Sequence, residues 1–325
     1  MSVSLALRNH PSLPIATRAR LQEIARNLGY RPNPMISALM RSLRVRRTRP
    51  PAAILAYITA FPSRDGWRRR PMFRRAFEGA QHRADQLGYR LEEFWLSEPG
   101  MNSQRLSQIL RARGICGVLI APLPRPRGHC SLDWDQFASA TIGYSLLRPS
   151  LHRAENHQAR TMHLALRRLA KLGYRRPGLV LSERFDARGD YNWSAAFLAR
   201  QHRLAADDMI PPLIASEFSA PLLRKWFRRH RPDVILSGDI AVFRCLRTLS
   251  RGQIPPVGFV HLEWSSDLEG IAGVRQNAWR VGAATVDLVV EQLEHGISGI
   301  PDVPKTVLIE GEWMDGVTAR PLAAR

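Results

Sequence analysis

Residues 2–39 read SVSLALRNHPSLPIATRARLQEIARNLGYRPNPMISAL, and this stretch is the most informative part of the chain. Its first residues, 2–7, predict a short helix, and the Asn-His-Pro-Ser run at 9–12 predicts a turn. A second helix is predicted at 15–28, because apolar side chains recur there at helical spacing along one face. The side chains of that apolar face are Leu21, Ile24, Ala25 and Leu28.

The end of the second helix carries a stop signal. Gly29 is the residue type that most often caps a helix at its carboxyl end, and Pro32 follows shortly after. Glu23 is the only acidic residue of residues 2–39, whereas basic residues are frequent, so the surface of the two helices is positively charged. A basic helical surface of this kind is typical of proteins that bind nucleic acid.

Four blocks of this stretch resemble the lactose/galactose/purine repressor (LacI/GalR) family of transcriptional regulators. The blocks are Val3–Leu7, Asn9, Thr17–Arg18 and Leu28–Asn33, and they match the DNA-binding headpiece of the family in order and spacing. In that family the first block is the recognition helix of a helix-turn-helix, which is read in the major groove. The resemblance therefore implies a DNA-binding regulator of transcription.

The resemblance also implies a hinge helix at 33–39. In the family a leucine of this helix wedges into the minor groove and kinks the duplex, and Leu39 occupies that position here. The partner is then a double-stranded DNA operator, bound by a dimer because one headpiece reads only a half-site. The DNA-binding residues implied by the resemblance are Ser2, Ser4, Leu5, Arg8, Asn9, Thr17, Arg18, Tyr30, Asn33, Ile36 and Leu39.

One part of the family pattern is missing. The family begins with a further helix that packs under the recognition helix, whereas this sequence starts inside the recognition helix at Met1. Isolated helices shorter than about 12 residues are marginally stable in water. We therefore expect the true start codon to lie upstream of Met1. The alternative is a truncated regulator that has lost DNA binding, or one that dimerises with full-length relatives and blocks them.

The net charge and the number of cysteines limit the classes of protein to which this chain can belong. The formal net charge of +20 comes almost wholly from arginine, since Lys171, Lys225 and Lys305 are the only lysines. Such a balance suggests a polyanionic partner, although a genome with high GC content also favours arginine codons. Three widely spaced cysteines suit a reducing compartment, and no apolar run approaches the length of a membrane span. We expect a cytoplasmic protein with no metal, no cofactor and no membrane contact.

Beyond a basic, proline-ended linker, predicted strands and helices alternate from residue 52 onward. This alternation predicts an α/β fold with parallel sheets covered by helices on both faces. Leu-Gly-Tyr triplets end predicted helices at 87–89 and 172–174, which are corresponding places in two similar halves. We therefore predict two Rossmann-like subdomains, and the resemblance identifies them with the periplasmic-binding-protein-like effector domain of the family.

The predicted domains follow from this organisation. Residues 1–32 form an incomplete all-α headpiece, residues 33–51 a hinge helix and linker, and residues 52–325 the effector and dimerisation domain. By analogy with the family, the helix at 281–293 returns to the first lobe and the final strand at 306–309 lies in the second. The predicted first lobe is 52–150 with 277–296, and the second is 151–276 with 297–325.

A small-molecule site is predicted in the cleft between the lobes. Ligands of doubly wound sheets bind at the carboxyl ends of the strands, and aromatic rings with scattered carboxylates there would suit a sugar. The predicted effector-binding residues are Phe61, Asp65, Trp67, Tyr144, Asn192, Trp193, Asp239 and His261. Three positions depart from the family's usual sugar-binding residues: Asn192–Trp193 replaces an arginine, Gly238–Asp239 replaces Asn-Asp, and Val260 replaces an aspartate.

Two other classes of protein compete with this interpretation. A solute-binding protein would share the fold, but the headpiece residues argue against it. A Rossmann-type enzyme is disfavoured, because the sequence holds no dinucleotide-binding glycine motif, no Walker loop and no nucleophile elbow. The leading prediction is a repressor that binds a palindromic operator as a homodimer and responds to a sugar-like effector.

Overall fold

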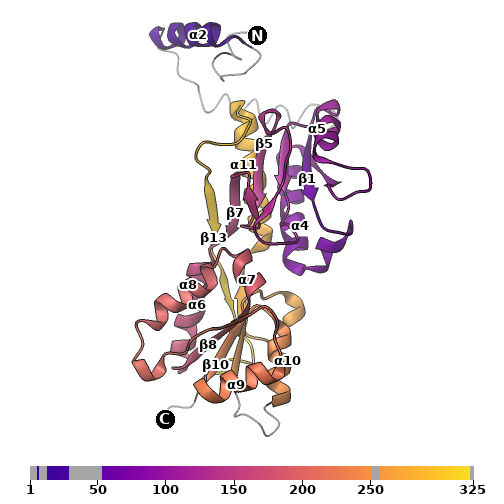
Figure 1. Cartoon of the computed structure of the whole chain (residues 1–325). Coiled ribbons are helices and arrows are strands. Elements are labelled where there is room, and N and C mark those ends of the chain that lie inside the picture. The colour runs from indigo at the N-terminus through magenta and orange to yellow at the C-terminus, as the bar shows by residue number, and fades with distance from the viewer. Residues whose placement is uncertain (1–5, 7–12, 29–52, 250–256, 323–325) are drawn as a thin grey trace.

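The computed structural model describes Ala6 and residues 13–28, 53–249 and 257–322. Helix α2 (Ile15–Asn27) agrees with the predicted second helix of the headpiece, and Figure 1 places it beyond the end of the first lobe. The Gln22 side-chain amide donates to the carbonyl oxygen of Ala6 at 2.8 Å. Within the described residues, the predicted apolar face of α2 remains partly exposed to solvent. The predicted hinge helix lies outside the described residues.

The first lobe is built on a parallel sheet with the strand order β13-β7-β5-β3-β1-β2 (Figure 1). Apolar side chains of β1 pack alternately on both faces, with Leu55 and Tyr57 toward α4 and α11, and Ala56 and Ile58 toward α5. The sheet is therefore the middle of three layers. Its elements are β1 (Ala53–Thr59), α4 (Pro71–Gln86), β2 (Tyr89–Trp95), α5 (Ser103–Ala112), β3 (Gly117–Ile120), β5 (Ala138–Ile142), β7 (His152–Asn156), α11 (Ala278–His295) and β13 (Thr306–Ile309).

The second lobe repeats this plan with the strand order β14-β12-β11-β10-β8-β9, in which β14 is antiparallel to β12. Aromatic side chains fill both of its cores, among them Trp193 and Phe197 on one face and Trp226 and Phe259 on the other. Its elements are α6 (Gln158–Lys171), β8 (Pro177–Ser182), α7 (Glu183–Arg188), α8 (Asn192–Gln201), β9 (Leu213–Ala215), α9 (Ala220–His230), β10 (Val234–Ser237), α10 (Ile240–Leu249), β11 (Gly258–His261), β12 (Gly273–Arg275) and β14 (Glu312–Met314).

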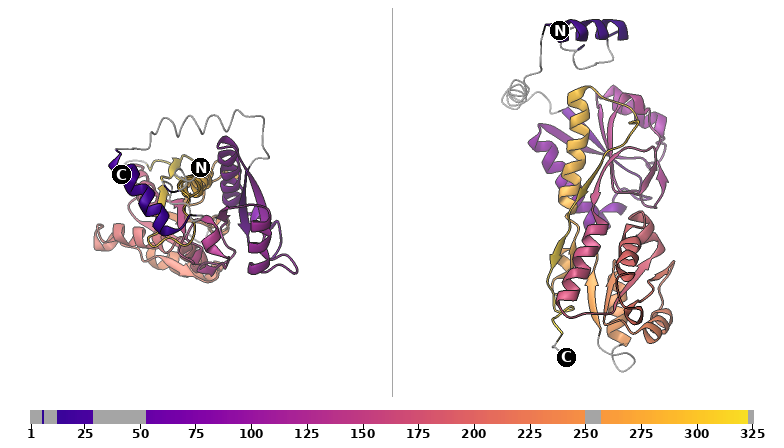
Figure 2. Two further views of the ribbon diagram at one scale, coloured as in Figure 1. Left: turned by 90° about the horizontal axis from the view of Figure 1, so that it is seen from above. Right: turned by 90° about the vertical axis from the view of Figure 1, so that its left-hand side faces the viewer.

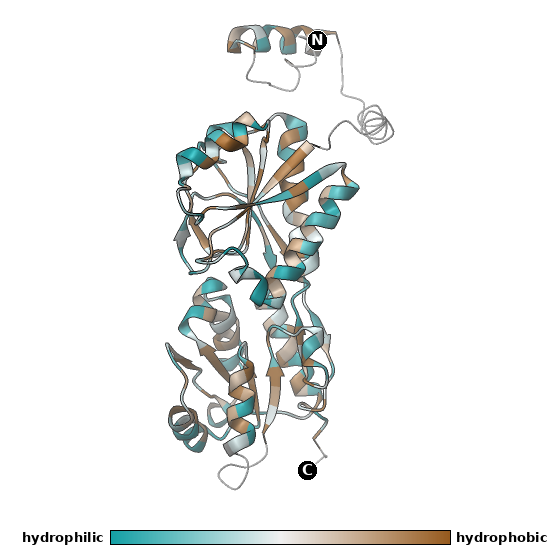
Figure 3. Ribbon diagram, turned by 90° about the vertical axis from the view of Figure 1, so that its right-hand side faces the viewer, coloured by the Kyte–Doolittle hydropathy of each residue, from teal (hydrophilic) through white to brown (hydrophobic). Residues whose placement is uncertain are grey.

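Shorter elements join these layers. Strands β4 and β6 form a small parallel pair beside the first lobe, and single 3-10 turns occur at four loops. Figure 3 shows apolar residues concentrated in the strands and on the inner faces of the helices, with polar residues outside. The elements are β4 (Gly128–His129), β6 (Leu146–Arg148), η1 (Gly66–Arg69), η2 (Trp134–Gln136), η3 (Ala206–Asp208) and η4 (Ser266–Leu268).

The predicted α/β class with two Rossmann-like lobes is confirmed. Two of the Leu-Gly-Tyr triplets end α4 and α6 as expected, and the glycines take left-handed conformations with φ of +82° at Gly88 and +93° at Gly173. A residue with a side chain disfavours this conformation, so glycine ends each helix and lets the next strand begin.

The predicted boundary between the lobes was wrong in two places. Strands β7 and β13 pair with each other and β7 pairs with β5, so both belong to the first sheet. The prediction had placed them in the second lobe, within 151–276 and 297–325. The partner of a short strand depends on packing and backbone pairing with distant residues, which the local pattern does not specify. The chain crosses between lobes after β7, before α11 and between β13 and β14 (Figure 2).

Helix α11 crosses α4 at very short range in the first lobe. A Cβ atom placed on Gly282 would lie 1.8 Å from the carbonyl oxygen of Ala76, and one on Gly79 would lie 1.9 Å from that of Trp279. Only glycine permits this close approach of two backbones. The segment that returns from the second lobe is therefore tightly held in the first. Among the described residues, none of the helices is both long and apolar enough to cross a membrane.

Candidate ligand-binding cleft

A cavity of about 450 Å³ lies between the two lobes. It is lined where strands of both sheets end, including Gly143 after β5, Glu155 in β7, Gly238 after β10 and His261 in β11. Parallel strands collect their carboxyl-end loops at one edge, which is where ligands of such sheets bind. The cavity also falls within the usual range of small-molecule sites, roughly 300–1,000 Å³.

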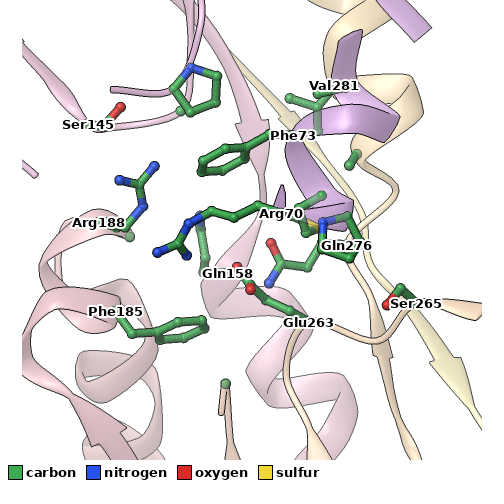
Figure 4. Close-up of a pocket in the computed structure, with 18 of the residues that line it drawn as sticks. Arg70, Phe73, Ser145, Gln158, Phe185, Arg188, Glu263, Ser265, Gln276 and Val281 are labelled. Carbon is green, nitrogen blue, oxygen red and sulfur yellow. The ribbon is translucent and has the colours of Figure 1, made fainter. Parts of the chain in front are cut away.

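Two arginines reach into this cavity, one from each lobe (Figure 4). Arg70 stands directly before α4 in the first lobe, and Arg188 ends α7 in the second. The guanidinium carbon of Arg70 lies 5.6 Å from the centre of the Phe73 ring, and that of Arg188 lies 5.0 Å from it. Burial, and next the charge of Arg70, lowers the pKa of Arg188 to about 10. Both guanidinium groups therefore lie over the Phe73 ring, and their positive charges repel each other.

Helix α7 is hydrogen-bonded across the cleft to the first lobe. Arg188 Nη1 donates to the carbonyl oxygen of Leu123 at 2.6 Å, and Arg184 Nη2 donates to that of Pro124. Both carbonyl groups belong to the segment that follows β3 in the first lobe. These two hydrogen bonds therefore join the lobes across the cleft.

Two half-buried carboxyl groups face the same cavity. Glu155 Oε1 accepts a hydrogen bond from the backbone N–H of Asn156 at 2.7 Å, and Gly143 leaves room for Oε2, which would lie 2.5 Å from a Cβ there. Burial raises the pKa of Glu155 to about 7. Burial also raises the pKa of Glu263, while the charges of Arg70 and Arg188 oppose that rise. The cleft thus holds a carboxyl group that titrates near neutral pH.

Neutral polar groups complete the lining. His261 Nδ1 accepts a hydrogen bond from the backbone N–H of Glu263 at 3.1 Å, and burial lowers the pKa of His261 to about 4. The ring is therefore neutral at pH 7 and carries its proton on Nε2. The Gln276 amide donates to the carbonyl oxygen of Leu262 at 2.8 Å, and Gln158 is nearly fully buried beside it (Figure 4). These groups can exchange hydrogen bonds with hydroxyls of a ligand.

Four of the eight predicted effector residues line this cavity: Tyr144, Trp193, Asp239 and His261. Their roles differ from the prediction in part. Trp193 is 2% exposed and packs within the core of the second lobe, and the Asp239 carboxylate accepts from the backbone N–H of Ala241 at 2.8 Å at the start of α10. Only part of each side chain is therefore directed to the cleft.

The other four predicted effector residues do not line the cavity. Trp67 is 1% exposed and packs with Tyr57 and Phe77 in the first lobe, so it is a core residue. Phe61 is buried against Phe73. Asp65 is exposed and pairs with Arg68 at 3.0 Å, and the Asn192 amide donates to the carbonyl oxygen of Gly189 at 2.8 Å.

Several residues of the cleft were missed by the sequence analysis. An arginine had been sought at Asn192–Trp193, whereas Arg188 stands on the unpredicted helix α7 just before it. A Cβ atom on Gly238 would lie 2.3 Å from the Phe185 ring, so this ring fills the space that a side chain at position 238 would need. Val260 is fully buried in the second core. The missed lining residues are Arg70, Phe73, Glu155, Gln158, Phe185, Arg188 and Gln276, whereas Glu263 lies in the loop that the sequence had already placed at the cleft.

The predicted DNA-binding surface is described only at Thr17 and Arg18, which lie in the first turn of α2. Thr17 is exposed and Arg18 half-buried. The other nine predicted contact residues lie outside the described residues, namely Ser2, Ser4, Leu5, Arg8, Asn9, Tyr30, Asn33, Ile36 and Leu39.

Comparison with known proteins places the fold. No family model and no curated protein matches the sequence. Solved structures do match: a LacI transcriptional regulator from a Rhodococcus species has a TM-score of 0.58 at 15% identity, with 82% of this chain and 98% of that chain covered.

Two further solved structures match nearly the whole chain. The transcriptional regulator CelR in complex with cellobiose has a TM-score of 0.58 at 17% identity, with 97% of this chain and 94% of that chain covered. The Lac repressor dimer bound to operator and the anti-inducer ONPF has a TM-score of 0.55 at 15% identity, with 98% and 94% covered. The chain therefore has the fold of the LacI-family transcriptional regulators.

Proposed function

We propose that this protein is a ligand-responsive transcriptional regulator that binds operator DNA as a homodimer in the cytoplasm. The observation that carries the proposal is the pairing, in one chain, of headpiece residues that resemble the LacI/GalR family with a two-lobed domain that encloses a polar cavity of about 450 Å³. The structures that share this fold include regulators in complex with cellobiose and with operator DNA.

The DNA-binding part of the proposal rests on the residues before the linker. Arginines near the phosphates would supply affinity, and side chains of the recognition helix would supply base choice. Leu39 would wedge into the minor groove and add bending. A net charge of +20 makes the phosphate contribution large and therefore sensitive to salt.

The regulatory part of the proposal rests on the cleft. Because Arg184 and Arg188 of the second lobe donate to carbonyl groups of the first, a ligand that contacts both lobes would compete with or reinforce these hydrogen bonds. The resulting rotation of the lobes would reach the dimer interface and the hinge helix, which is a common form of allosteric switch. Repression is the output that we propose, with the effector weakening or strengthening operator binding.

The experiment is selection of DNA sites from a random duplex library with the purified chain, extended upstream if the reading frame continues there. We expect a palindromic consensus and a dissociation constant that rises steeply with salt, with a log–log slope of about −0.9 per neutralised phosphate. A chain with the open upstream frame that enriches no sequence would overturn the proposal, whatever the cleft binds.

A further inference from the structure

The cleft presents cations whose donors are not used up within the protein. Arg188 directs Nη1 to Leu123, which leaves its other N–H groups toward the cavity beside Arg70 (Figure 4). In the part of the chain that the structure describes, neither guanidinium forms a direct ion pair, although the charges of Glu263 and Glu155 act on Arg188. Two like charges that face one aromatic ring repel each other, and burial raises the cost for Arg188.

The carboxylates of the cleft are in a different position. Asp239 accepts from the amino-terminal turn of α10, and Asp267 accepts from the hydroxyl of Ser265. Glu155 accepts from the backbone and has a pKa of about 7, so it is partly protonated at neutral pH. Glu263 is the exception, because the charges of Arg70 and Arg188 act on it and oppose the rise of its pKa on burial. The other three carboxyl groups are hydrogen-bonded to groups of the protein, so Arg70 and Arg188 keep donors for a ligand.

We infer that the ligand of this cleft carries an anionic group, a carboxylate or a phosphate, that binds between Arg70 of the first lobe and Arg188 of the second. This inference rests on the proposed function, in which the cleft binds the effector. Arginine is well suited to bind such a group, because its planar guanidinium donates two parallel hydrogen bonds to a carboxylate or to a phosphate.

The rest of the cavity fits a polyol attached to that anion. Glu263, Gln276 and Gln158 lie around the Arg70 side chain (Figure 4), and together they offer acceptors and donors for hydroxyl groups. The Phe73 ring is covered by the two guanidinium groups, whereas Phe185 lines the cavity and supplies an apolar surface for the C–H side of a sugar ring. The class of ligand is therefore a sugar acid or a sugar phosphate of roughly hexose size.

The position of the anion also explains how binding would reach the hinge. An anion held by one arginine from each lobe bridges the cleft and removes the repulsion between the two cations. Because this bridge adds to the hydrogen bonds from α7 to Leu123 and Pro124, the bound state favours the lobe arrangement that keeps them. A neutral sugar can accept hydrogen bonds from both arginines, but it leaves their mutual repulsion in place.

The test compares D-gluconate and D-glucose 6-phosphate with D-glucose as probes of the full chain. Thermal melts are recorded at constant ionic strength, since free salt screens exposed charges. We expect a rise in melting temperature with at least one of the two acids and a smaller rise, or none, with glucose. Binding of gluconate would indicate that the anionic group of the ligand is a carboxylate, and binding of glucose 6-phosphate would indicate a phosphate.

Variants then assign the effect to the cationic pair. Arg188→Met and Arg70→Met keep an unbranched stem but remove the guanidinium group, and each should weaken binding of the stabilising acid about ten- to hundredfold by calorimetry. Arg74→Met on α4, whose side chain is exposed and lies outside the cavity lining, is the matched control and should bind as wild type does. Arg70 is also exposed, so its replacement tests the inference without endangering the fold.

Three results would overturn the inference: no response to either acid, an equal response to glucose, or unchanged binding in both arginine variants. DNA binding is measured separately and does not enter this test. If glucose alone stabilises the protein, the proposed regulatory function still stands and only the proposal of an anionic ligand is refuted. Conversely, if the chain binds gluconate or glucose 6-phosphate but selects no DNA site, the anionic ligand is supported and the proposed regulatory function is refuted.

Discussion

Replacing Glu155 with glutamine should stabilise the protein, and it should do so more strongly at pH 8 than at pH 5. The side chain is half-buried near the end of β7, and the loss of solvent around it raises its pKa from 4.5 to about 7. The folded protein therefore holds a proton that the unfolded chain releases between these two values. Stability falls as pH rises through this window, and above pH 7 the whole cost of ionising the buried group is present.

The magnitude follows from the two pKa values. The cost of the charge is about 1 kcal/mol at pH 5 and about 3 kcal/mol at pH 8. Glutamine keeps an oxygen that can accept from the backbone N–H of Asn156, as Glu155 Oε1 does at 2.7 Å, so the variant removes the charge and little else. We expect Glu155→Gln to raise the free energy of unfolding by up to these amounts.

Urea unfolding at pH 5 and pH 8 measures the effect. The difference between wild type and variant cancels the titration of other groups, provided that they do not couple strongly to Glu155. Glu263→Gln tests that proviso, since burial raises its pKa as well and it lies in the same cavity. A stabilisation of Glu155→Gln that is equal at the two pH values would refute the assignment of a raised pKa to this carboxyl group.

Three further predictions concern other parts of the chain. Gly282→Ala should destabilise the protein by about 1–3 kcal/mol or more, because its Cβ would meet the carbonyl oxygen of Ala76 at 1.8 Å; urea midpoints measure this, and wild-type stability would contradict it. Leu39→Ala should weaken operator binding in a band-shift titration while the circular dichroism melt stays unchanged, and unaltered affinity would remove the hinge wedge. Gly238→Ala should displace the Phe185 ring and weaken ligand binding in calorimetry, with little change in the melting temperature; wild-type binding would show that the ring position does not shape the cleft.

Much of the architecture was open to prediction from the sequence because it depends on local signals. The alternation of strand and helix patterns defines an α/β fold, and the glycines at positions 88 and 173 end helices because a left-handed conformation is needed there. The helix α2 was predicted from the spacing of its apolar residues. These features require only neighbours in sequence, so each can be recognised without knowing the fold.

The assignment of short strands to lobes required the tertiary structure. Strands β7 and β13 are stabilised by backbone hydrogen bonds to partners that are distant in sequence, and their side-chain pattern fits either sheet. Family analogy placed the final strand in the wrong lobe for this reason. The points at which the chain crosses between the lobes are therefore set by the pairing of strands, which the amino-acid pattern of each strand does not specify.

The candidate site divides in the same way. The sequence by itself placed Tyr144, Asp239 and His261 in the cleft, because strands of a parallel sheet end at a common edge. It could not show that Trp67 turns inward to Tyr57, since an aromatic residue in a loop suits a core and a binding site equally well. Only the tertiary structure brought Arg70 and Arg188 together beside one ring, because they come from different lobes and their proximity depends on how the two lobes pack.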